Sequence, residues 1–318
     1  MKFCFWMDPY QSLNLQTETS LLMMGSLLDK GHQVDWLEIE GLGLHQDQVV
    51  FQVRPLVSTS PFELGAEVSV AAAEYQCMVI RKDPPFDLNY FHATLLLQHL
   101  PQSVVQINPA SALAEFNEKL VALNWPEYTP DTWTGMCAQG LLEFTQLHQK
   151  VVVKPLGDCS GRGIELIDLE IEGTLEQLLG LFEDDQGGKR FLTAQKFLPL
   201  VSAGDKRIFL LAGKPVGMVN RVPAEGSFLG NIHQGAICEP TELSPREADI
   251  VADLGPKLFA KGLFLVGLDM IGEQVTEINL TSPSAVRQIN EVQGGNIMEE
   301  IVPQLIEYVA QKTTQHNL

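Results

Sequence analysis

Apolar residues in the first third of the chain recur in two alternating patterns. The runs "KFCFWM" (2–7) and "QVDWLEI" (33–39) have the aromatic and aliphatic character of strands. Between them, "SLLMMGSLLDKGH" (20–32) repeats its apolar residues about every 3.6 positions and has Gly31 past its end, which predicts a helix. Strands that alternate with helices in this way predict an open α/β sheet over residues 1–120.

A further strand in this region leads into a charged loop. The segment "QCMVIRKDPPFD" (76–87) predicts a buried strand followed by a loop that its prolines enforce. The loop carries Arg81, Lys82, Asp83 and Asp87. Because α/β sheets hold ligands in loops beyond their strand ends, this loop is a candidate part of a binding site.

The pattern changes over residues 121–200. The segments "KVVVKPL" (150–156), "GIELIDLE" (163–170) and "RFLTAQKFL" (190–198) predict strands. The segment "TLEQLLGLFEDD" (174–185) predicts a helix. Such a combination is typical of a small α+β domain.

Residues 201–318 predict a third domain, also α+β. The segment "KRIFLLAGKPVGMVNRV" (206–222) predicts a hairpin with a tight turn, and residues 246–261 predict a helix. A second hairpin and a C-terminal helix follow. Arg207 and Arg221 fall on the paired strands of the first hairpin, where their guanidiniums could hold anionic oxygens or be plain surface charges.

The second hairpin, "VGLDMIGEQVTEINLTSP" (266–283), contains three polar side chains that a plain strand pair does not need. If residues 272–274 form a three-residue loop, Asp269 lies directly across from Glu277. Asn279 then falls on the same face, because strand side chains alternate with a period of two. Opposed carboxylates need a cation or a proton between them, and hard oxygen donors suit Mg²⁺. A solvated acidic face is the alternative interpretation.

Charge and cysteine content narrow the classes of partner. The 318-residue chain has 40 acidic and 21 basic residues, a formal charge of −19, which disfavours nucleic acid and anionic membranes as partners. The N-terminal apolar run is too short for a signal sequence, and no run approaches the length of a membrane span. The 5 cysteines are scattered and show no C-x-x-C spacing, which is typical of reduced thiols in the cytoplasm.

Three segments could contribute to a nucleotide site. In "VVVKPLGDCSGRGIEL" (151–166), Lys154 ends a strand and a glycine-rich loop follows, whose N–H groups could approach phosphate. The lysine precedes the glycines, so the segment is not a P-loop, and a hairpin turn with a surface lysine is the alternative. The segment "TAQKFLP" (193–199) could offer backbone groups to a planar base or be an ordinary edge strand. Lys119, in "FNEKL" (116–120), is the weakest of these signals.

Taken together and in this order, the segments resemble the ATP-grasp carboxylate–amine ligases, and most closely the bacterial glutathione synthetases. The most specific pieces, which span nearly the whole chain, are "RKDPPFD" (81–87), "NEKL" (117–120), "KPL" (154–156), "GDKR" (204–207) and the block 262–283. The resemblance implies an ATP-grasp fold with an N-terminal open, Rossmann-like α/β domain (1–120). A small α+β lid domain (121–200) and a C-terminal α+β catalytic domain (201–318) would follow.

The resemblance also implies which residues would bind ATP and metal. Two Mg²⁺ ions are expected, with Mn²⁺ as a substitute. The expected contacts are Lys119 and Lys154 with the phosphates; Gly157, Ser160, Gly161 and Gly163 in the loop over them; Phe197 and Leu198 with adenine; Asp205 with ribose; and Asp269, Glu277 and Asn279 with the magnesium ions.

The remaining implied residues concern the reacting groups. Arg207 and Arg221 would steady an acyl phosphate, with Asn231 in a loop over it. Asp83, Ser282 and Arg287 would help to seat the peptide substrate.

The chemistry that such residues serve is the activation of a carboxylate. A carboxylate is a poor electrophile, so transfer of the γ-phosphoryl group of ATP to it gives an acyl phosphate that an amine can attack. Charge neutralisation and exclusion of water are then the main tasks, and no side-chain nucleophile is needed. The resemblance implies γ-glutamylcysteine and glycine as the small-molecule substrates, and a homo-oligomer, expected as a tetramer.

Several positions depart from the family pattern, and most of them fall in the expected second-substrate region. They are Gln16 and Thr17, Cys159 and Arg162 in the glycine-rich loop, Leu229, His233 and Gln234 in the segment 224–240, and Asn290. Because hydrogen-bond partners in a buried site decide selectivity, the acyl donor and the acceptor amine stay open. The alternatives are a related ligase that joins another carboxylate and amine, or a non-catalytic nucleotide-binding paralogue.

Overall fold

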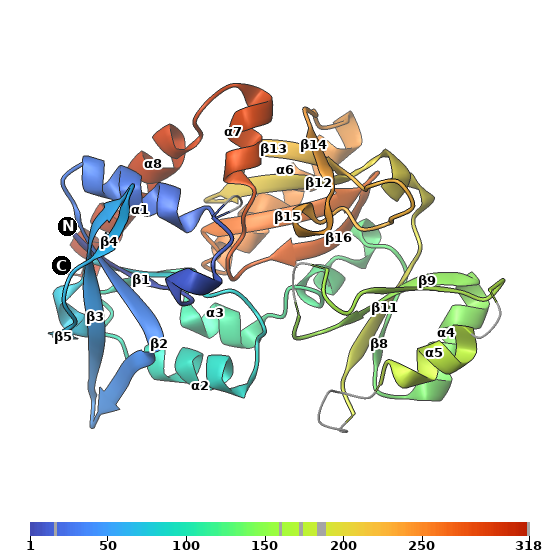
Figure 1. The fold of residues 1–318 in the computed structure, drawn as a ribbon, viewed down its shortest axis with the longest axis horizontal. Helices are drawn as coiled ribbons and strands as arrows, with labels where there is room; N and C mark the ends of the chain where they lie inside the picture. The colour runs from blue at the N-terminus through green and yellow to red at the C-terminus, as the bar shows by residue number, and fades with distance from the viewer. Residues whose placement is uncertain (16–17, 159–160, 172–173, 183–188, 317–318) are drawn as a thin grey trace.

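Three β-sheets organise the described part of the chain, which comprises residues 1–15, 18–158, 161–171, 174–182 and 189–316 of this computed structural model (Figure 1). We call them the sheets of the N-terminal, central and C-terminal units. The strands are β1 (Lys2–Trp6), β2 (Gln33–His45), β3 (Gln48–Thr59), β4 (Phe62–Leu64), β5 (Val68–Ala71), β6 (Cys77–Ile80) and β7 (Val105–Ile107) in the first unit; β8 (Thr132–Gly135), β9 (Lys150–Pro155), β10 (Glu165–Asp168) and β11 (Leu192–Lys196) in the second; and β12 (Asp205–Leu211), β13 (Lys214–Val222), β14 (Ile237–Glu239), β15 (Leu265–Ile271) and β16 (Gln274–Asn279) in the third.

Helices connect and cover these sheets. The α-helices are α1 (Ser20–Asp29), α2 (Leu88–Leu97), α3 (Ala110–Glu115), α4 (Ala138–His148), α5 (Thr174–Gly180), α6 (Pro245–Ala260), α7 (Val286–Gln293) and α8 (Met298–His316). Short 3-10 turns are η1 (Tyr10–Ser12), η2 (Ala72–Glu74), η3 (Val121–Asn124), η4 (Pro126–Tyr128), η5 (Pro199–Ala203) and η6 (Ile232–Gln234). No helix in the described ranges is long and apolar enough to cross a membrane.

The N-terminal sheet is mixed. Its order is β4-β3-β2-β1-β6-β7, with β5 paired to β3. The strands β2, β1, β6 and β7 pair with one another in parallel, as the alternating strands and helices predict. The long antiparallel hairpin of β2 and β3 was not predicted.

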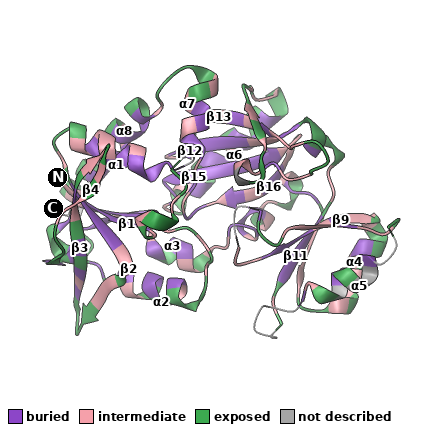
Figure 2. Cartoon of the chain, in the orientation of Figure 1, coloured by how far each residue is buried: buried purple, intermediate pink, exposed green. Residues whose placement is uncertain are grey.

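Two hydrophobic cores join the N-terminal unit to the C-terminal unit. Alternate residues of β1 feed them: Cys4 and Trp6 pack with α2, α3 and α6, whereas Phe3 and Phe5 pack with α1, α7 and α8. Strand β12 divides its side chains between the same two cores. Figure 2 shows the buried residues along the middle strands of both sheets. These two units therefore pack as one body.

Asn108, just after β7, strengthens this junction. Its side-chain nitrogen donates to the carbonyls of Leu265 (2.7 Å) and Leu280 (2.8 Å). Its side-chain oxygen accepts from the backbone N–H groups of Phe264 (2.7 Å) and Leu265 (3.0 Å). One buried amide thus holds the start of β15 and the end of β16 against the N-terminal sheet.

The central unit has a separate core. Its sheet, ordered β10-β9-β11-β8, packs against α4 and α5 through residues such as Leu141, Val153 and Leu178. Strand β11 pairs with both β9 and β8, so the edge-strand interpretation of residues 193–199 is wrong. Hydrogen bonds that join this unit to the rest include those from Asn117 to the carbonyl of Leu156 and from Gln195 to the carbonyl of Thr276.

Candidate active site

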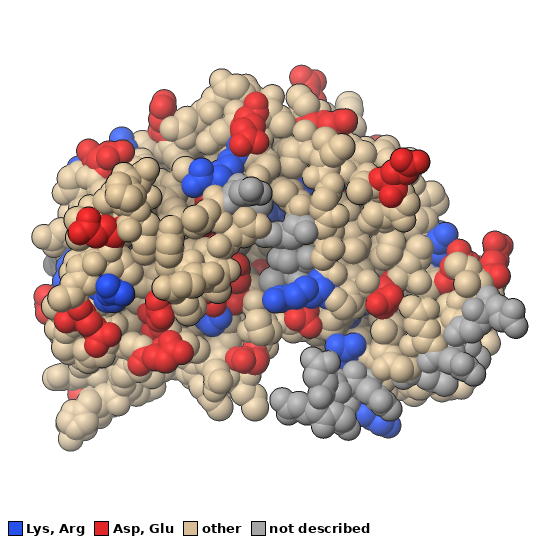
Figure 3. All heavy atoms as spheres, viewed as in Figure 1, with Lys and Arg blue, Asp and Glu red and all other residues tan. Residues whose placement is uncertain are grey.

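A large cavity lies where the three units meet. Counting the space open to solvent, it encloses about 1550 Å³. Its walls include Glu18 and Asp83 from the N-terminal unit, Lys154 from the central unit, and Arg207 and Asp269 from the C-terminal unit. Figure 3 shows acidic side chains scattered over one face of the molecule, with basic ones among them. All three units therefore contribute charged side chains to one cavity.

The hairpin of β15 and β16 forms the floor of the cavity. Asp269 pairs with Glu277 across it, as predicted, but the loop is one residue shorter than predicted. Ile271 pairs with Gln274 and Met270 with Val275, so Thr276 is an extra residue in a bulge. The bulge restores the register that places Asp269 opposite Glu277.

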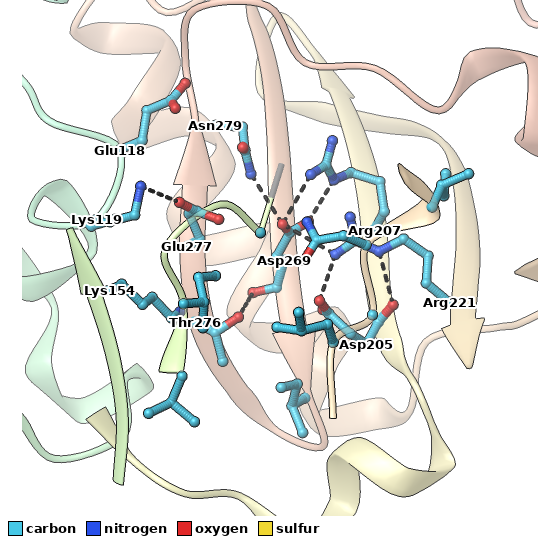
Figure 4. Close-up of a pocket in the computed structure, with 18 of the residues that line it drawn as sticks. Glu118, Lys119, Lys154, Asp205, Arg207, Arg221, Asp269, Thr276, Glu277 and Asn279 are labelled. Carbon is cyan, nitrogen blue, oxygen red and sulfur yellow. Dashed lines mark hydrogen bonds and ion pairs between the residues drawn. The ribbon is translucent and has the colours of Figure 1, made fainter. Parts of the chain in front are cut away.

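Asp269 is the centre of a buried ionic network (Figure 4). Arg207 donates two parallel hydrogen bonds to it, from Nε to Oδ1 and from Nη2 to Oδ2 (2.9 Å). The Nη2 atom of Arg221 lies 3.1 Å from Asp269 Oδ2 and 2.7 Å from Asp205 Oδ2. Asn279 donates its amide to Asp269 Oδ2 at 3.1 Å. The bidentate pair fixes the direction of the Arg207 guanidinium, and Arg221 Nη2 bridges Asp205 and Asp269.

The charges in this network shift the pKa values of its members. Burial alone would raise the pKa of Asp269, but the guanidiniums of Arg207 and Arg221 outweigh it and hold this pKa below its usual value. Burial raises the pKa of Asp205 despite the opposing charge of Arg221, and Asp269 adds to the rise. Asp269 is therefore ionised at neutral pH, whereas Asp205 is the carboxylate that gains a proton more easily.

Two lysines face the hairpin from the other side. Lys119 Nζ lies 3.3 Å from Glu277 Oε1 and also donates to the carbonyl of Asp158. Lys154 Nζ donates to the side-chain oxygen of Gln195 at 2.8 Å. Burial lowers the pKa of Lys154, although Glu277 opposes this effect. Neither lysine is the solvated surface residue of the alternative interpretation, since their exposed fractions are 5% and 9%.

Glu118 fastens the segment that precedes Lys119 to the end of β16. Its Oε1 accepts from the backbone N–H groups of Leu280 (2.7 Å) and Thr281 (2.9 Å) and from the Thr281 hydroxyl (2.8 Å). Its own carbonyl accepts from the N–H of Ile278 at 3.1 Å. Burial raises the pKa of Glu118, and the charge of Glu277 adds to the rise. Glu118 thereby fixes the strand that carries Glu277 and Asn279.

The N-terminal end of the cavity contains a charged cluster near the "RKDPPFD" loop. The buried Arg81 donates to the Ser20 hydroxyl (2.9 Å) and to the carbonyl of Pro283 (2.8 Å), which joins α1 to the segment after β16. Asp83 opens onto the cavity. Desolvation by the surrounding protein atoms raises the pKa of Asp83 to about 7, and the charge of Glu18 adds to the rise. The charge of Arg81 and a hydrogen bond from Ser282 oppose it.

Comparisons with known proteins agree on what this site belongs to. The sequence matches the ATP-grasp domain of prokaryotic glutathione synthetase over residues 118–294 and the N-terminal domain of prokaryotic glutathione synthetase over residues 1–113. The chain belongs to the prokaryotic glutathione synthetase family. It is 34% identical to the glutathione synthetase of Nitrosomonas europaea over 98% of this chain and 99% of that one. It is also 34% identical to that of Synechocystis sp. over 95% and 98%.

Solved structures show the fold that the family shares. D-cycloserine synthetase DcsG superposes with a TM-score of 0.67 at 12% identity, covering 96% of this chain and 99% of that one. A RimK domain ATP-grasp protein from Sphaerobacter thermophilus gives 0.64 at 14% identity, covering 95% and 98%. The ATP-grasp fold is therefore confirmed. Family membership makes the chain an ATP-dependent ligase that forms a C–N bond.

The cavity gathers most of the residues that the family resemblance implied. Those that line it are Asp83, Lys119, Lys154, Gly161, Phe197, Leu198, Asp205, Arg207, Arg221, Asn231, Asp269, Glu277, Asn279 and Ser282. Gly157, Gly163 and Arg287 do not line it. Gly157 accepts through its carbonyl from Phe86 N–H (3.0 Å), and Arg287 Nε donates to the carbonyl of Glu18 (3.2 Å). Ser160 lies outside the described residues.

Some of the positions that depart from the family pattern line the cavity, and others do not. Arg162 and Leu229 line the cavity, and Phe228 and Ile232 lie beside Leu229 on its wall. Asn290 does not line it; its side-chain oxygen accepts from Ile297 N–H at 2.9 Å, at the start of α8. Residues 16, 17 and 159, and the side chain at position 233, lie outside the description.

Sequence analysis missed three residues that shape the site: Glu118, Gln195 and Thr276. Glu118 directly precedes Lys119 in the "NEKL" segment, so its position next to a candidate phosphate ligand could have identified it. Gln195 was visible as a polar residue within a strand. The role of Thr276 had no sequence signal, because a bulge depends on how the two strands pair.

Proposed function

We propose that this chain forms glutathione from γ-glutamylcysteine and glycine, converting ATP to ADP and phosphate through an acyl phosphate. The observation that carries the proposal is the cavity in which Lys119, Lys154, Arg207 and Arg221 face the carboxylates of one hairpin. The close match to glutathione synthetases along nearly the whole chain supports the choice of substrates.

ATP would lie between the central and C-terminal units. Phe197 and Leu198, at the end of β11, would hold adenine, and Lys119 and Lys154 would bind phosphate oxygens. Asp205 would accept from a ribose hydroxyl. In support, its Oδ1 is buried and has no hydrogen-bond partner among the described residues, while its Oδ2 holds Arg221.

Magnesium fits the donor set on the hairpin. Asp269 is held ionised, and Asp269, Glu277 and Asn279 all line the cavity. Within the described residues, no group of three or more His, Cys, Asp or Glu side chains could hold a metal by itself. Two carboxylates and an amide suit Mg²⁺, which completes its shell with water and substrate phosphates. When bound, it would neutralise phosphate charge during transfer.

The reaction needs two displacements. An oxygen of the cysteinyl carboxylate attacks the γ-phosphorus of ATP, and the bond to the bridging oxygen breaks to release ADP. The neutral amine of glycine then attacks the acyl carbon, phosphate leaves with the electron pair of the C–O bond, and the nitrogen loses one proton and keeps the other as the amide N–H. Arg207 and Arg221, oriented by Asp269, would stabilise the charge on the transferred phosphoryl group. Asn231, on the facing loop, would help to exclude water.

A ligase for a different carboxylate and amine is the second candidate. Phe228, Leu229 and Ile232 line the cavity where polar groups would select glycine by its carboxylate. Apolar walls discriminate weakly between amines that differ by a methylene. A larger or less polar acceptor would suit this wall.

ADP release from ATP, measured across a matrix of carboxylates and amines with product masses, distinguishes these candidates. We expect turnover that requires both γ-glutamylcysteine and glycine and yields glutathione. Turnover only with another pair would overturn the substrates but keep the acyl phosphate. ATP binding without turnover for any pair would favour a non-catalytic paralogue. A cytoplasmic homo-oligomer, expected as a tetramer, stays a prediction that light scattering of the purified protein and fractionation of cells would test.

A further inference from the structure

Gln195 connects two parts of the site that belong to different units. It lies on β11 of the central unit, lines the cavity and is 5% exposed. Its Oε1 accepts from Lys154 Nζ at 2.8 Å, and its Nε2 donates to the carbonyl of Thr276 at 3.3 Å. Figure 4 shows Lys154 and Thr276 on facing elements of the site. One side chain therefore spans from the proposed phosphate lysine to the hairpin of Asp269 and Glu277.

Chemistry dictates the direction of this amide. A lysine ammonium has three donors and no acceptor, so only the oxygen of Gln195 can face it. The NH₂ group must then point to the carbonyl of Thr276, which can only accept. Reversing the amide would break both hydrogen bonds, and the arrangement is thus fixed at each end.

The strand register supports the contact with Lys154. On the paired strands β9 and β11, Gln195 lies across from Val152 and Lys154 across from Thr193. Gln195 and Lys154 are diagonal neighbours on one face, a distance that long side chains can bridge. Lys154 has no ion pair within the described ranges, so the amide oxygen is what directs its Nζ.

The contact with Thr276 falls at the bulge. Thr276 is the extra residue that allows Asp269 to face Glu277, and its own hydroxyl donates to the carbonyl of Asp269 at 3.4 Å. A donor on β11 aimed at the bulge carbonyl would hold the position of β16 relative to β11. Gln195 does this from inside the cavity, next to Lys154.

We propose that Gln195 is a positioning residue: it orients Lys154 toward the ATP phosphates and registers the central unit against the β15–β16 hairpin. The inference rests on the proposed role of Lys154 in phosphate binding. If Gln195 acts through Lys154, removing Lys154 should make Gln195 irrelevant to ATP binding. A merely structural role would instead add its own effect whether or not Lys154 is present.

A double-mutant cycle separates these outcomes. Lys154→Met, Gln195→Met and the double variant are compared by KM for ATP and kcat at saturating ATP, with unfolding midpoints as the check on folding. Hydrogen bonds to charged groups are strong enough that we expect Gln195→Met to raise KM for ATP about 10-fold or more, with a smaller change in kcat. The double variant should match Lys154→Met within about 2-fold.

Gln274→Met is the matched control. Gln274 lies on β16 of the same hairpin, and its Nε2 donates to the carbonyl of Thr129 at 3.4 Å, outside the cavity. We expect this variant to leave KM for ATP within about 2-fold of the unaltered protein. A rise equal to that of Gln195→Met would show a general loss of packing and overturn the inference.

Two further results would contradict the proposal at different levels. If the effects of Lys154→Met and Gln195→Met on KM multiply, Gln195 does not act through Lys154, although the proposed function stands. If Lys154→Met itself leaves KM for ATP unchanged, the phosphate role of Lys154 is wrong and the inference falls with it. Should Gln195→Met fail to fold, Gln195→Leu, which also removes both polar atoms, replaces it in the same cycle under the same criteria.

Discussion

Asp269 lies directly across the β15–β16 hairpin from Glu277, yet the two carboxylates form ion pairs with different basic side chains. Asp269 is held by the guanidiniums of Arg207 and Arg221, whereas Glu277 faces Lys119. This division relieves the repulsion that two opposed carboxylates would otherwise suffer. Among the described residues, Glu277 makes one ion pair, with Lys119, and so it is the freer of the two carboxylates to bind a metal.

Replacing Glu277 by Gln should nearly abolish ADP release while the fold is retained. The substitution keeps the shape but removes the charge that would hold Mg²⁺, and we expect a fall of about 100-fold or more. ADP release as a function of Mg²⁺ concentration measures it. Glu273→Gln, in the exposed turn of the same hairpin, should change little. Full turnover by Glu277→Gln would disprove the metal assignment.

Glu118 should make stability fall as pH rises above the usual glutamate range. Its folded pKa is raised by burial and by Glu277, so the folded state binds more protons than the unfolded state between the two pKa values. The contribution of Glu118 to the free energy of unfolding is then greatest below about pH 4.5, and it is lost as pH rises through the folded pKa. Glu118→Gln can still accept at Oε1 and should remove that part of the slope.

Urea unfolding at several pH values tests the prediction for Glu118. The difference in unfolding free energy between Glu118→Gln and the unaltered protein should shift in favour of the variant as pH rises from 4 toward 8. Glu127→Gln, at an exposed position, serves as the control. A difference that is constant over this range would show that burial does not raise the pKa of Glu118.

Removing Asn108 should weaken the junction of the N-terminal and C-terminal units. Asn108→Ala leaves two buried carbonyls and two buried N–H groups without their partner. We expect a loss of about 3 kcal/mol or more in unfolding free energy, since each unsatisfied buried group costs about 1–3 kcal/mol. Asn124→Ala removes a bond at an exposed residue and should cost far less. Equal losses for both variants would contradict the role of Asn108.

Gly255 should not tolerate even a methyl group. A Cβ at this position of α6 would lie 2.0 Å from the carbonyl oxygen of Gly213, in the turn between β12 and β13. Gly213 has a φ of +78° and is itself close to Gly255, so the turn cannot easily move away. We expect Gly255→Ala to cost about 1–3 kcal/mol or more in unfolding free energy.

Gly180 in α5 is the contrasting position for thermal unfolding. A Cβ there would meet no atom of the described residues within 4 Å, and alanine favours a helix over glycine by about 1 kcal/mol. Gly180→Ala should therefore be neutral or stabilising. Two variants with the same loss would mean that the close approach of α6 to the turn is not what makes Gly255 necessary.

The sequence by itself determined the elements whose patterns are local. The apolar runs of β1 and β12, the helical spacing of α1, and the hairpin of Asp269 and Glu277 can be read from residues near each other in the chain. A period of two or of 3.6 follows from backbone geometry, so no distant partner is needed to recognise it. The polar residues of the second hairpin were identified for the same reason.

Only the tertiary structure decided which partners those residues meet. Arg207 is 62 residues from Asp269, Lys154 is 41 from Gln195, and Glu118 is 162 from Leu280. Their contacts exist because the packing of the three units brings distant strand ends to one cavity. No periodic pattern in the sequence predicts which strand ends meet. The bulge at Thr276 shows the same limit on a smaller scale: the sequence places Asp269 opposite Glu277, but the pairing of both strands determines which residue is the extra one.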